Sequence, residues 1–476
     1  MAAEPAALAR RMAGLPPYED PCARGAHAAN PRQGCASPPA RDQCIAAERR
    51  SAPPVLGRTT PTRLAPGRRR FKVSCVTSDS AHTWEAHRRY VSTGALAADL
   101  LREPVLRAWE RCHLQGASPR RLRAVQLEPP ETERLLAHRQ PLLQAARPYV
   151  QALARAAGAE RHAAMLGDPR GVVLDVLGDP ASTLGPDRVP GPGSLLSEAV
   201  SGANGIGTPL AERGYVELVG PEHFIEGFHP FTCQGIPILG PDGAVTGVIS
   251  VSVRRVEAGR RLRELLVCAA HGVEAELIRQ RLDDDVRQLV AAGGRDDEPL
   301  LERLRQDLVQ VQATARLGVA SAARDLARDR LEVAARLLSL ARASIAEFAR
   351  QSALWRDLAA TAAAPPRLVD VAELVRDLAT LLRTEAATAR LTLAVDIAEP
   401  LHVEVDPPAL SRRLLRAALQ AFDVARGGGT ARVSLRRRGD GLCEVLLCAT
   451  PPPAPDAGQP LSLSLPVGPA RERPAW

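Results

Sequence analysis

Four side chains of the kinds that bind metal ions lie close together near the middle of the chain. They fall within twelve residues: Glu222, His223, His229 and Cys233. Carboxylate, imidazole and thiolate groups are common protein ligands of zinc and iron. Neither histidine belongs to a recognised ligand spacing, however, and such groups also form structural hydrogen bonds within a hairpin. We therefore expect no metal and no other cofactor, and we keep Glu222, His223 and Cys233 as candidate contacts for an organic ligand.

A second group of polar residues lies in the glycine-rich run SEAVSGANGIGT, residues 197–208. Its three glycines permit close approach of the backbone, and Asn204 suits a left-handed residue or an Asx-turn. One interpretation is that these residues only shape a loop. The other is that four polar side chains of the run line a ligand pocket over a sheet: Ser197, Glu198, Asn204 and Thr208.

Several other chemistries are excluded by composition. Lys72 is the only lysine and stands outside any GxxxxGK[ST] run, so the sequence has no P-loop. The nine cysteines include no CxxC pair, which argues against a zinc ribbon or a disulfide framework. No apolar run approaches the roughly 18 residues of a membrane span, and no signal-peptide core is present. We expect a cytoplasmic protein with reduced thiols and no membrane partner.

The formal charge of +8 belongs to one end of the chain. Residues 1–72 hold thirteen bases against five acids, and the remaining residues carry equal numbers of each. Only 3% of the residues are aromatic, so the folded part lacks both the charge and the stacking groups for nucleic acid. Residues 1–80 contain eleven prolines and no sustained periodicity, which predicts a disordered tail. A short tail is also expected over residues 469–476.

The residues between the tails indicate first a sensor-sized α+β unit. Helical spacing dominates residues 81–158, and after residue 161 short runs rich in Val and Ile alternate with turn pairs such as Asp242-Gly243. That texture predicts strands of one antiparallel sheet.

Long amphipathic helices follow the predicted sheet. One apolar stripe suits a signalling helix over residues 257–297, and two more suit a helical hairpin over residues 298–362. Because the stripes leave apolar faces that one hairpin cannot cover, we expect a homodimer through residues 298–360 in a four-helix arrangement. Residues 366–468 then alternate helical and strand patterns, as in an α/β sandwich.

Residues 81–256 resemble the GAF sensor domain at the front of sigma-54-dependent activators of the acetoin-catabolism-regulator type. Four runs occur in the family's order: AWERCHLQGASP, SEAVSGANGIGT, GPEHF and TCQGIPILGPDGAVTGVISVS. Leu196 stands where the family has Trp, and Ala203 where it has Thr. The resemblance implies a pocket that binds a small organic molecule, with a specificity altered by these two departures.

The AAA+ ATPase and helix-turn-helix modules of those activators have no counterpart motif in this sequence. The C-terminal third instead resembles the core of a two-component histidine kinase. The similar runs are RLGVASAARDLARDRL from Arg316, VEVDPPALSRRLLRAALQAF from Val403 and GQPLSLSLPV from Gly458. They imply a dimerisation hairpin followed by an ATPase-like domain.

The residues that perform kinase chemistry are missing from the matching positions. Arg324 stands at the phosphoacceptor position, and Arg413 and Ala417 stand where asparagines would help to hold Mg²⁺. Ala449 replaces the aspartate that holds adenine, and prolines between residues 451 and 455 replace the glycine turn. Because acceptor, metal ligand and adenine anchor are absent together, the resemblance implies a pseudo-histidine kinase without enzymatic activity.

The sequence therefore predicts an α+β multidomain regulator in three folded parts. They are a GAF antiparallel sheet with helices, a helical dimerisation stalk and a histidine-kinase-ATPase-like α/β sandwich. The protein would sense a small organic ligand and act by binding a protein partner of a signalling pathway. Two alternatives stay open: an active sensor histidine kinase with an atypical phosphoacceptor, and a DNA-binding transcription regulator of the acetoin-regulator type. For the latter, a local basic patch is available from Arg412, Arg413, Arg416, Arg436, Arg437 and Arg438.

Overall fold

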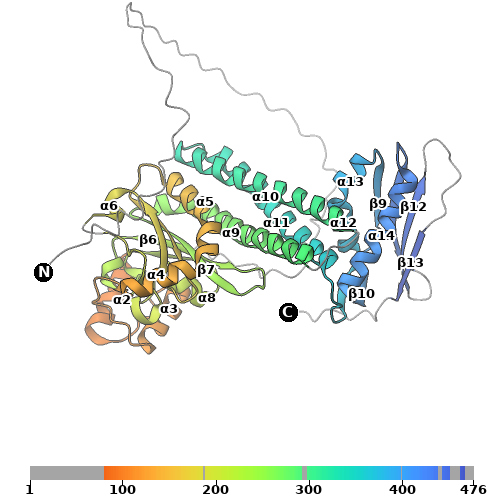
Figure 1. Ribbon diagram of the computed structural model, residues 1–476. Coiled ribbons are helices and arrows are strands. Elements are labelled where there is room, and N and C mark those ends of the chain that lie inside the picture. The colour runs from red at the N-terminus through yellow and green to blue at the C-terminus, as the bar shows by residue number, and fades with distance from the viewer. Residues whose placement is uncertain are drawn as a thin grey trace, which may run out of the picture. The chain divides into compact units, whose positions relative to one another are not determined.

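The computed structural model describes residues 80–185, 188–291, 297–397, 399–437, 442–450 and 461–466 (Figure 1). The predicted tails over residues 1–80 and 469–476 and the prolines between residues 451 and 455 lie outside the described residues, apart from Ser80. Within the described part, no helix is long and apolar enough to cross a lipid bilayer.

A five-stranded antiparallel sheet forms the centre of the first part of the chain. Its strand order is β3-β2-β7-β6-β5. The strands are β2 (His162–Gly167), β3 (Val173–Gly178), β5 (Val216–Val219), β6 (Thr232–Leu239) and β7 (Val245–Val253). Gly243 in the β6–β7 turn has φ 79°, the left-handed region that favours glycine. The predicted antiparallel sheet is confirmed.

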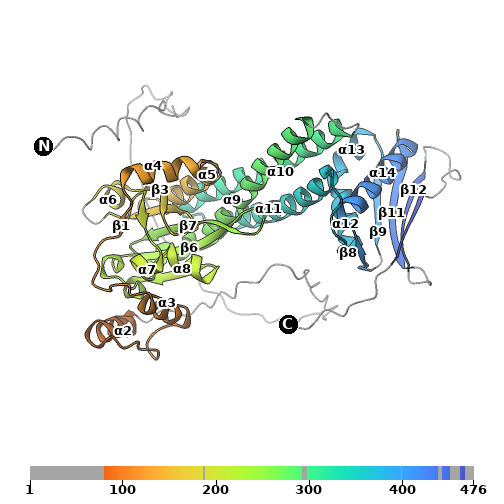
Figure 2. The ribbon, with the colours of Figure 1, turned by 60° about the horizontal axis from the view of Figure 1, so that its bottom comes forward.

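Helices cover both faces of this sheet (Figure 2). One face packs against α5 (Gln140–Ala157) and α9 (Val256–Ala291). The other lies under α2 (Ser80–Thr93), α3 (Glu103–Leu114), α7 (Glu198–Ser201) and α8 (Gly207–Glu212). Alternation along β7 separates the faces, because Ile249 and Val251 join the core under α5 and α9 while Val248 joins the other.

Shorter elements connect these layers. They are β1 (Val125–Gln126), α4 (Pro129–His138), α6 (Pro180–Thr183), β4 (Ser194–Leu195) and the 3₁₀ turns η1 (Gly220–Glu222) and η2 (Glu226–Phe228). Strands β1 and β4 pair with each other. The stretch from η1 to η2 leads into β6 and covers the edge of the α2 and α3 layer.

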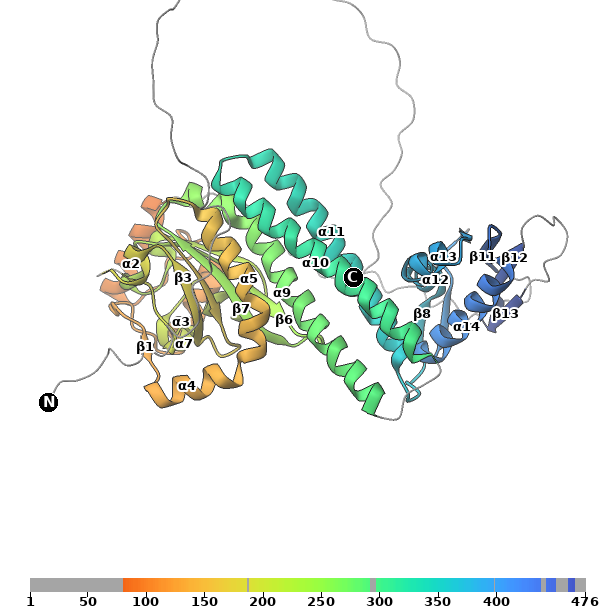
Figure 3. The ribbon, with the colours of Figure 1, turned by 45° about the horizontal axis from the view of Figure 1, so that its top comes forward.

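The hairpin α10 (Glu298–Ala327) and α11 (Leu331–Ala359) packs against α5 and α9 (Figure 3). The buried stripes comprise Leu304, Leu308, Ala315, Val319, Ala322 and Leu326 on α10, with Ala334, Leu338, Ala341, Ile345 and Phe348 on α11. The stripes are therefore buried within one chain, among α5, α9, α10 and α11. A homodimer was expected because one hairpin cannot cover these apolar faces, and that reason is wrong, since α5 and α9 of the same chain cover them.

Polar contacts fix the register of these helices. The Gln312 amide donates to Glu276 Oε2 at 2.7 Å between α10 and α9, and both side chains are buried. Asp283 of α9 accepts from Arg305 of α10 at 2.7 Å. The Trp355 indole of α11 donates to the Leu301 carbonyl at 2.8 Å.

The last part has the predicted α/β texture. A four-stranded sheet has the order β13-β12-β11-β9, and β9 is parallel to β11. Its strands are β9 (Thr392–Ile397), β11 (Thr430–Arg437), β12 (Leu442–Thr450) and β13 (Leu461–Pro466), and its helices are α12 (Val371–Leu381), α13 (Arg383–Thr388) and α14 (Pro407–Ala425). A separate antiparallel pair joins β8 (Arg367–Asp370) to β10 (His402–Val405).

One boundary in this part differs from the predicted pattern. A single helix over the run from Val369 to Thr388 is expected, yet the helix begins at Val371 and is interrupted at Leu382. Asp370 caps α12, because its Oδ1 accepts from the Ala372 and Glu373 amides at 3.0 and 3.2 Å. The residues before the cap are consequently free to pair with β10 as β8.

Candidate ligand-sensing site

A small cavity of about 20 Å³ lies on the α7 and α8 side of the sensor sheet. It is lined by Met165, Val189, Pro190, Leu196, Asn204, Gly205, Ile206, Phe228, Phe231, Cys233 and Ser252. Strands β2, β6 and β7 form its floor, and the glycine-rich run and the η2 region form its walls. A space of this size holds about one water molecule, so a larger ligand must displace part of a wall.

Asn204 lines the cavity, but its side chain is fully used by the loop. Its Nδ2 donates to the Leu196 and Gly202 carbonyls at 2.8 and 2.7 Å, and its Oδ1 accepts from the Ile206 and Gly207 amides at 2.8 and 2.9 Å. An amide group has two donor hydrogens and two acceptor lone pairs. Asn204 therefore has no hydrogen-bonding capacity left for a ligand, although it is one of the residues that line the cavity.

Cys233 and Ser252 supply the polar groups on the floor of the cavity. Their Sγ and Oγ atoms are 3.1 Å apart. Burial raises the pKa of the Cys233 thiol to about 11, so the sulfur remains protonated and is a poor metal ligand or nucleophile at neutral pH. Ser250, two residues earlier on β7, is buried with no hydrogen-bond partner for its Oγ.

Glu198 forms an ion pair instead of facing the cavity. The Arg111 guanidinium of α3 donates to its two oxygens at 2.6 and 2.9 Å, and Glu198 is only 5% exposed. Glu212 of α8 accepts a further bond from Arg111 at 2.8 Å. The hydrogen bond that Arg111 donates to Glu198 is the largest influence that raises the pKa of Arg111. The pair thus joins α3 to the start of the glycine-rich run.

Glu222 forms a second buried ion pair of the same kind. Arg102, at the start of α3, donates to both carboxylate oxygens, at 2.6 Å through Nε. The Val219 amide donates to Glu222 Oε2 at 2.8 Å, and the Trp109 indole donates to the Glu222 carbonyl at 2.9 Å. These bonds hold α3 against η1.

The histidines of the 220–231 loop lie beside α2. His223 is fully buried, and its Nδ1 is 2.8 Å from the Gly220 carbonyl. The Nε2 of His229 is 3.2 Å from the His223 carbonyl. Burial lowers the pKa of His223 to about 4, and burial together with neighbouring histidines lowers the pKa of His229 to about 3. Among the described residues, no group of three His, Cys, Asp or Glu side chains is placed to hold a metal ion.

Of the seven residues proposed from the sequence, two border the cavity, Asn204 and Cys233. Thr208 accepts a hydrogen bond from the Asn204 amide at 3.0 Å, and Ser197 is the residue before α7. Glu198, Glu222 and His223 serve the surrounding scaffold. Ser252, which borders the cavity, was missed by sequence reasoning. Its place among alternating apolar residues of β7 is the signal that could have found it.

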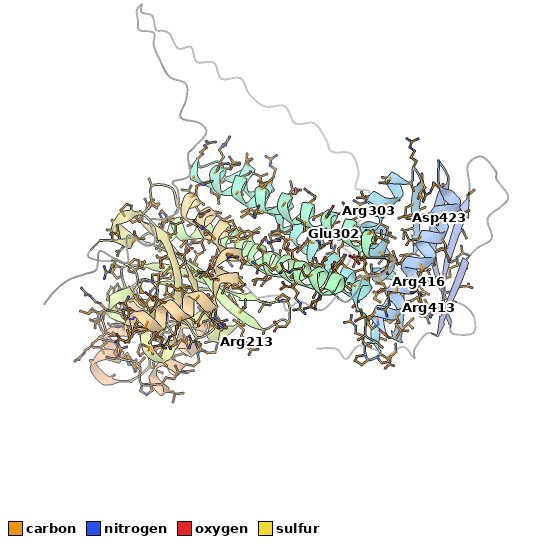
Figure 4. All side chains as sticks on the ribbon, viewed as in Figure 1. Arg213, Glu302, Arg303, Arg413, Arg416 and Asp423 are labelled. Atoms are coloured by element: carbon orange, nitrogen blue, oxygen red, sulfur yellow. The ribbon has the colours of Figure 1, made fainter. Side chains whose placement is uncertain are left out.

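The positions matched to kinase chemistry lie elsewhere. Arg324 is exposed on α10 and donates to Ser321 Oγ at 2.9 Å. Arg413 and Arg416 lie on the exposed side of α14 (Figure 4), and neither forms an ion pair with a described residue. Arg412 is not part of an open patch, because it donates to the Ala360 carbonyl at the end of α11.

Comparison with known proteins gives similarity in the first part of the chain. Residues 79–276 match the family model described as MimR, N-terminal domain. The acetoin dehydrogenase operon transcriptional activator AcoR of Bacillus subtilis is 27% identical over 215 residues, 45% of this chain and 35% of that protein. The propane 2-monooxygenase operon transcriptional activator MimR of Mycolicibacterium smegmatis is 29% identical over 195 residues, 40% of this chain and 32% of that protein. The match therefore spans about a third of these relatives.

The solved structures that align with this chain do so with low TM-scores and low sequence identity. The complex of DhaR(N) with DhaL from E. coli aligns with a TM-score of 0.36 and 16% identity, covering 40% of this chain and 65% of that one. The catalytic domain of histidine kinase ThkA aligns with a TM-score of 0.18 and 17% identity, covering 20% of this chain and 63% of that one. By sequence, the first part of the chain is similar to the N-terminal part of transcriptional activators. The kinase-like assignment of residues 298–468 rests on its sequence runs alone.

Proposed function

We propose that this protein is a ligand-sensing regulator of transcription whose sensor is the part up to α9. Two facts support the proposal: the MimR N-terminal domain model matches residues 79–276, and the curated relatives that match there are transcriptional activators. The alternative drawn from the acetoin-regulator resemblance is thereby favoured over a purely kinase-like role. The ligand is a small, largely apolar organic molecule, because apolar side chains dominate the cavity lining.

The observation that carries the proposal is the way in which the shared motifs join around the cavity. Trp109 and Arg111 of the first run bond to Glu222 of the third and Glu198 of the second. Asn204 of the second run then folds the loop that borders Cys233 of the fourth. Motifs far apart in the sequence therefore form one hydrogen-bonded scaffold around the cavity. Only the residues of the cavity wall are left to determine which ligand binds.

Transmission to the rest of the chain runs through α9. This helix begins three residues after β7, the strand that carries Ser252, and it packs against α5 and against both helices of the hairpin. The sheet and α9 can pack in more than one arrangement. A ligand that binds one arrangement more tightly shifts the equilibrium toward that arrangement, by an amount set by its difference in affinity. The buried Gln312–Glu276 hydrogen bond makes the hairpin follow α9.

The output part acts by contact and not by phosphoryl transfer. Arg324 is a guanidinium, which remains protonated and has no free lone pair to attack a phosphate. Ala417 and Ala449 have no polar side-chain atom for Mg²⁺ or adenine. Arg413 and Arg416 remain exposed for an acidic partner surface. Incubation with labelled ATP and Mg²⁺ should leave no acid-labile phosphate on the chain, and labelling that survives Arg324→Ala would instead establish a kinase with another acceptor.

The sensor function is tested by a thermal-shift screen of small organic molecules on the full chain. A true ligand should raise the unfolding midpoint of the wild type, and Ser252→Ala should weaken its binding about fivefold or more through loss of one hydrogen bond. Ser339→Ala, on the exposed side of α11, is the matched control and should bind as the wild type does. Equal binding by Ser252→Ala and Ser339→Ala would place the ligand outside the cavity.

The transcriptional role is tested separately by retention of promoter DNA fragments. The purified chain is incubated with the fragments alone and, in a second arm, together with a cell extract that supplies a partner protein, and we expect retention in at least one arm. Retention of promoter fragments by the protein alone would support direct DNA binding. If promoter fragments are retained neither by the protein alone nor in the presence of a cell extract that supplies the partner, a role in transcription is refuted.

A further inference from the structure

Three histidines lie where α2 meets the loop that runs from η1 through η2, and the rings of two of them are in contact. The ring centroids of His87 on α2 and His229 on the loop are 4.4 Å apart, with the rings nearly perpendicular. The Trp84 ring of α2 packs edge-on against His229 at 5.1 Å. His223 completes the group through its carbonyl, which lies 3.2 Å from His229 Nε2. His87 and His229 thus form part of the contact between α2 and this loop, together with the Tyr90 and Phe224 rings, whose centroids are 5.2 Å apart.

The cluster has little capacity to hold positive charge. His87 and His223 are 4% and 0% exposed, and the Nε2 atom of each has no hydrogen-bond partner. None of the three rings forms an ion pair with a described residue. A protonated imidazole has two N–H donors that both need acceptors, so protonation would bury an unpaired donor and a charge together.

The other charged groups around the cluster do not compensate for this. From the loop, Glu226 faces His87 and acts to raise its pKa, but burial outweighs that effect and the pKa of His87 is lowered. Glu222 is already bound by Arg102. From α3, His113 bonds to the Tyr90 hydroxyl.

Two further sets of charges border the region. Arg254 stacks on the Phe231 ring, beyond the loop. The remaining charged side chains of α2 lie on its exposed side: His82, Glu85, Arg88 and Arg89. Neither set supplies an acceptor to the three imidazoles.

We propose that protons are a second input to this sensor, and that acidification releases α2 from the 220–231 loop through combined protonation of His87, His223 and His229. The neutral cluster holds the helix in place, and the charged cluster is compatible only with the open arrangement. The release reaches the cavity, because the ring centroids of His223 and Phe228 are 6.0 Å apart and Phe228 lines the cavity wall. This input does not depend on the organic ligand.

The direction of the pH effect follows from linkage. All three histidines have a pKa below the ordinary value near 6.5 when the helix is closed. The closed form is therefore fully stabilised above about pH 6.5 and loses stability as the pH falls below it. Each histidine that takes up a proton on opening adds a factor of ten per pH unit to the opening constant, and three together approach a thousandfold.

Hydrogen–deuterium exchange on the full chain tests the proposal. Protection factors, each corrected for the intrinsic exchange rate at the same pH, are measured for peptides from residues 80–93 and 220–231 between pH 7.5 and 5. We expect α2 protection to fall more than tenfold per pH unit below pH 6.5, with peptides of α10 unaffected. His87→Gln and His229→Gln keep a side-chain donor and should each lower the pH slope by about tenfold per unit.

The control and the refuting outcomes are defined by the same measurement. His138→Gln, an exposed residue of α4, should retain the wild-type slope. If α2 does not form in His87→Gln, the pH slope of His229→Gln tests the proposal, because His229 lies on the loop and not on α2. A pH-independent protection of α2 in the wild type, or an unchanged slope in His229→Gln, overturns the proposal.

Discussion

At the scale of single residues, the polar groups of the sensor's motifs serve its structure. Glu198 and Glu222 are each held by an arginine of the α3 region, and Asn204 is saturated by backbone groups. Buried carboxylates remain charged at acceptable cost only when paired in this way. The residues that meet a ligand are then the less distinctive ones that line the cavity, such as Ser252 and Phe231.

Asn204→Ala should destabilise the protein and not merely weaken ligand binding. The change removes four hydrogen bonds and leaves two amides and two carbonyls without their partner, so we expect a loss of about 3 kcal/mol in the free energy of unfolding. Asn204→Asp keeps the two bonds accepted from Ile206 and Gly207 and should lose less. Urea unfolding measures both, and a loss below about 1 kcal/mol in Asn204→Ala would show that the loop does not need this side chain.

At the scale of elements, α5, α9 and the hairpin form one packed unit. A Cβ on Gly272 of α9 would lie 2.2 Å from the Tyr149 ring of α5, and Tyr149 is 1% exposed. Glycine is thus required for two helices to approach closely around a buried tyrosine. The Glu276 and Gln312 pair lies one turn further along α9.

Gly272→Ala should therefore be destabilising even though alanine is the better helix former. Alanine gains up to about 1 kcal/mol in helix propensity, while the overlap with Tyr149 costs about 1–3 kcal/mol. Adding Tyr149→Ala to Gly272→Ala should give a smaller loss than the sum of the single changes. Thermal unfolding of the four proteins measures the coupling. Strict additivity would mean that the two residues do not touch.

The homodimer remains a prediction, but the surface expected to form it is now the exposed side of the hairpin. Gly318 faces Ala341 across the hairpin, with a built Cβ 3.3 Å from the alanine methyl. The preceding residues, Leu317 and Leu340, therefore lie at one level on the same outward side, and each is 67% exposed. We expect dimers at micromolar concentration that the double change Leu317→Asp and Leu340→Asp converts to monomers in sedimentation velocity.

The control for the dimer is a buried leucine. Leu308 is 1% exposed within the chain's own four helices, so Leu308→Asp should lower the thermal midpoint, whereas the two exposed changes should not. A wild-type protein that sediments as a monomer at these concentrations would contradict a dimer through the hairpin.

At the scale of the whole molecule, the excess positive charge belongs to residues 1–72 of the sequence. Residues 1–72 carry all of the formal charge of +8, and their composition cannot support a core. Deletion of residues 1–75 should leave the thermal midpoint within about two degrees of the full chain. Differential scanning calorimetry measures this, and a larger loss would show that the segment packs on the rest.

Local periodicity predicts which segments become helices and strands, because it encodes the buried face of each element. The helix and strand patterns expected within residues 366–468 are found as α12 to α14 and β8 to β13. One local exception is the Asp370 cap, which places the start of α12 at Val371. The motif order also identified the sensor domain, which the comparison with activators supports.

Tertiary structure alone decided what covers each face and which charges meet. The apolar stripes of α10 and α11 are the same whether a second copy or α5 and α9 covers them, since periodicity records only that a face is buried. Arg111 meets Glu198 across 87 residues of sequence, and Arg102 meets Glu222 across 120. No local pattern encodes such a pairing, because it arises only when the folded sensor brings α3 to the loops that lie over the sheet.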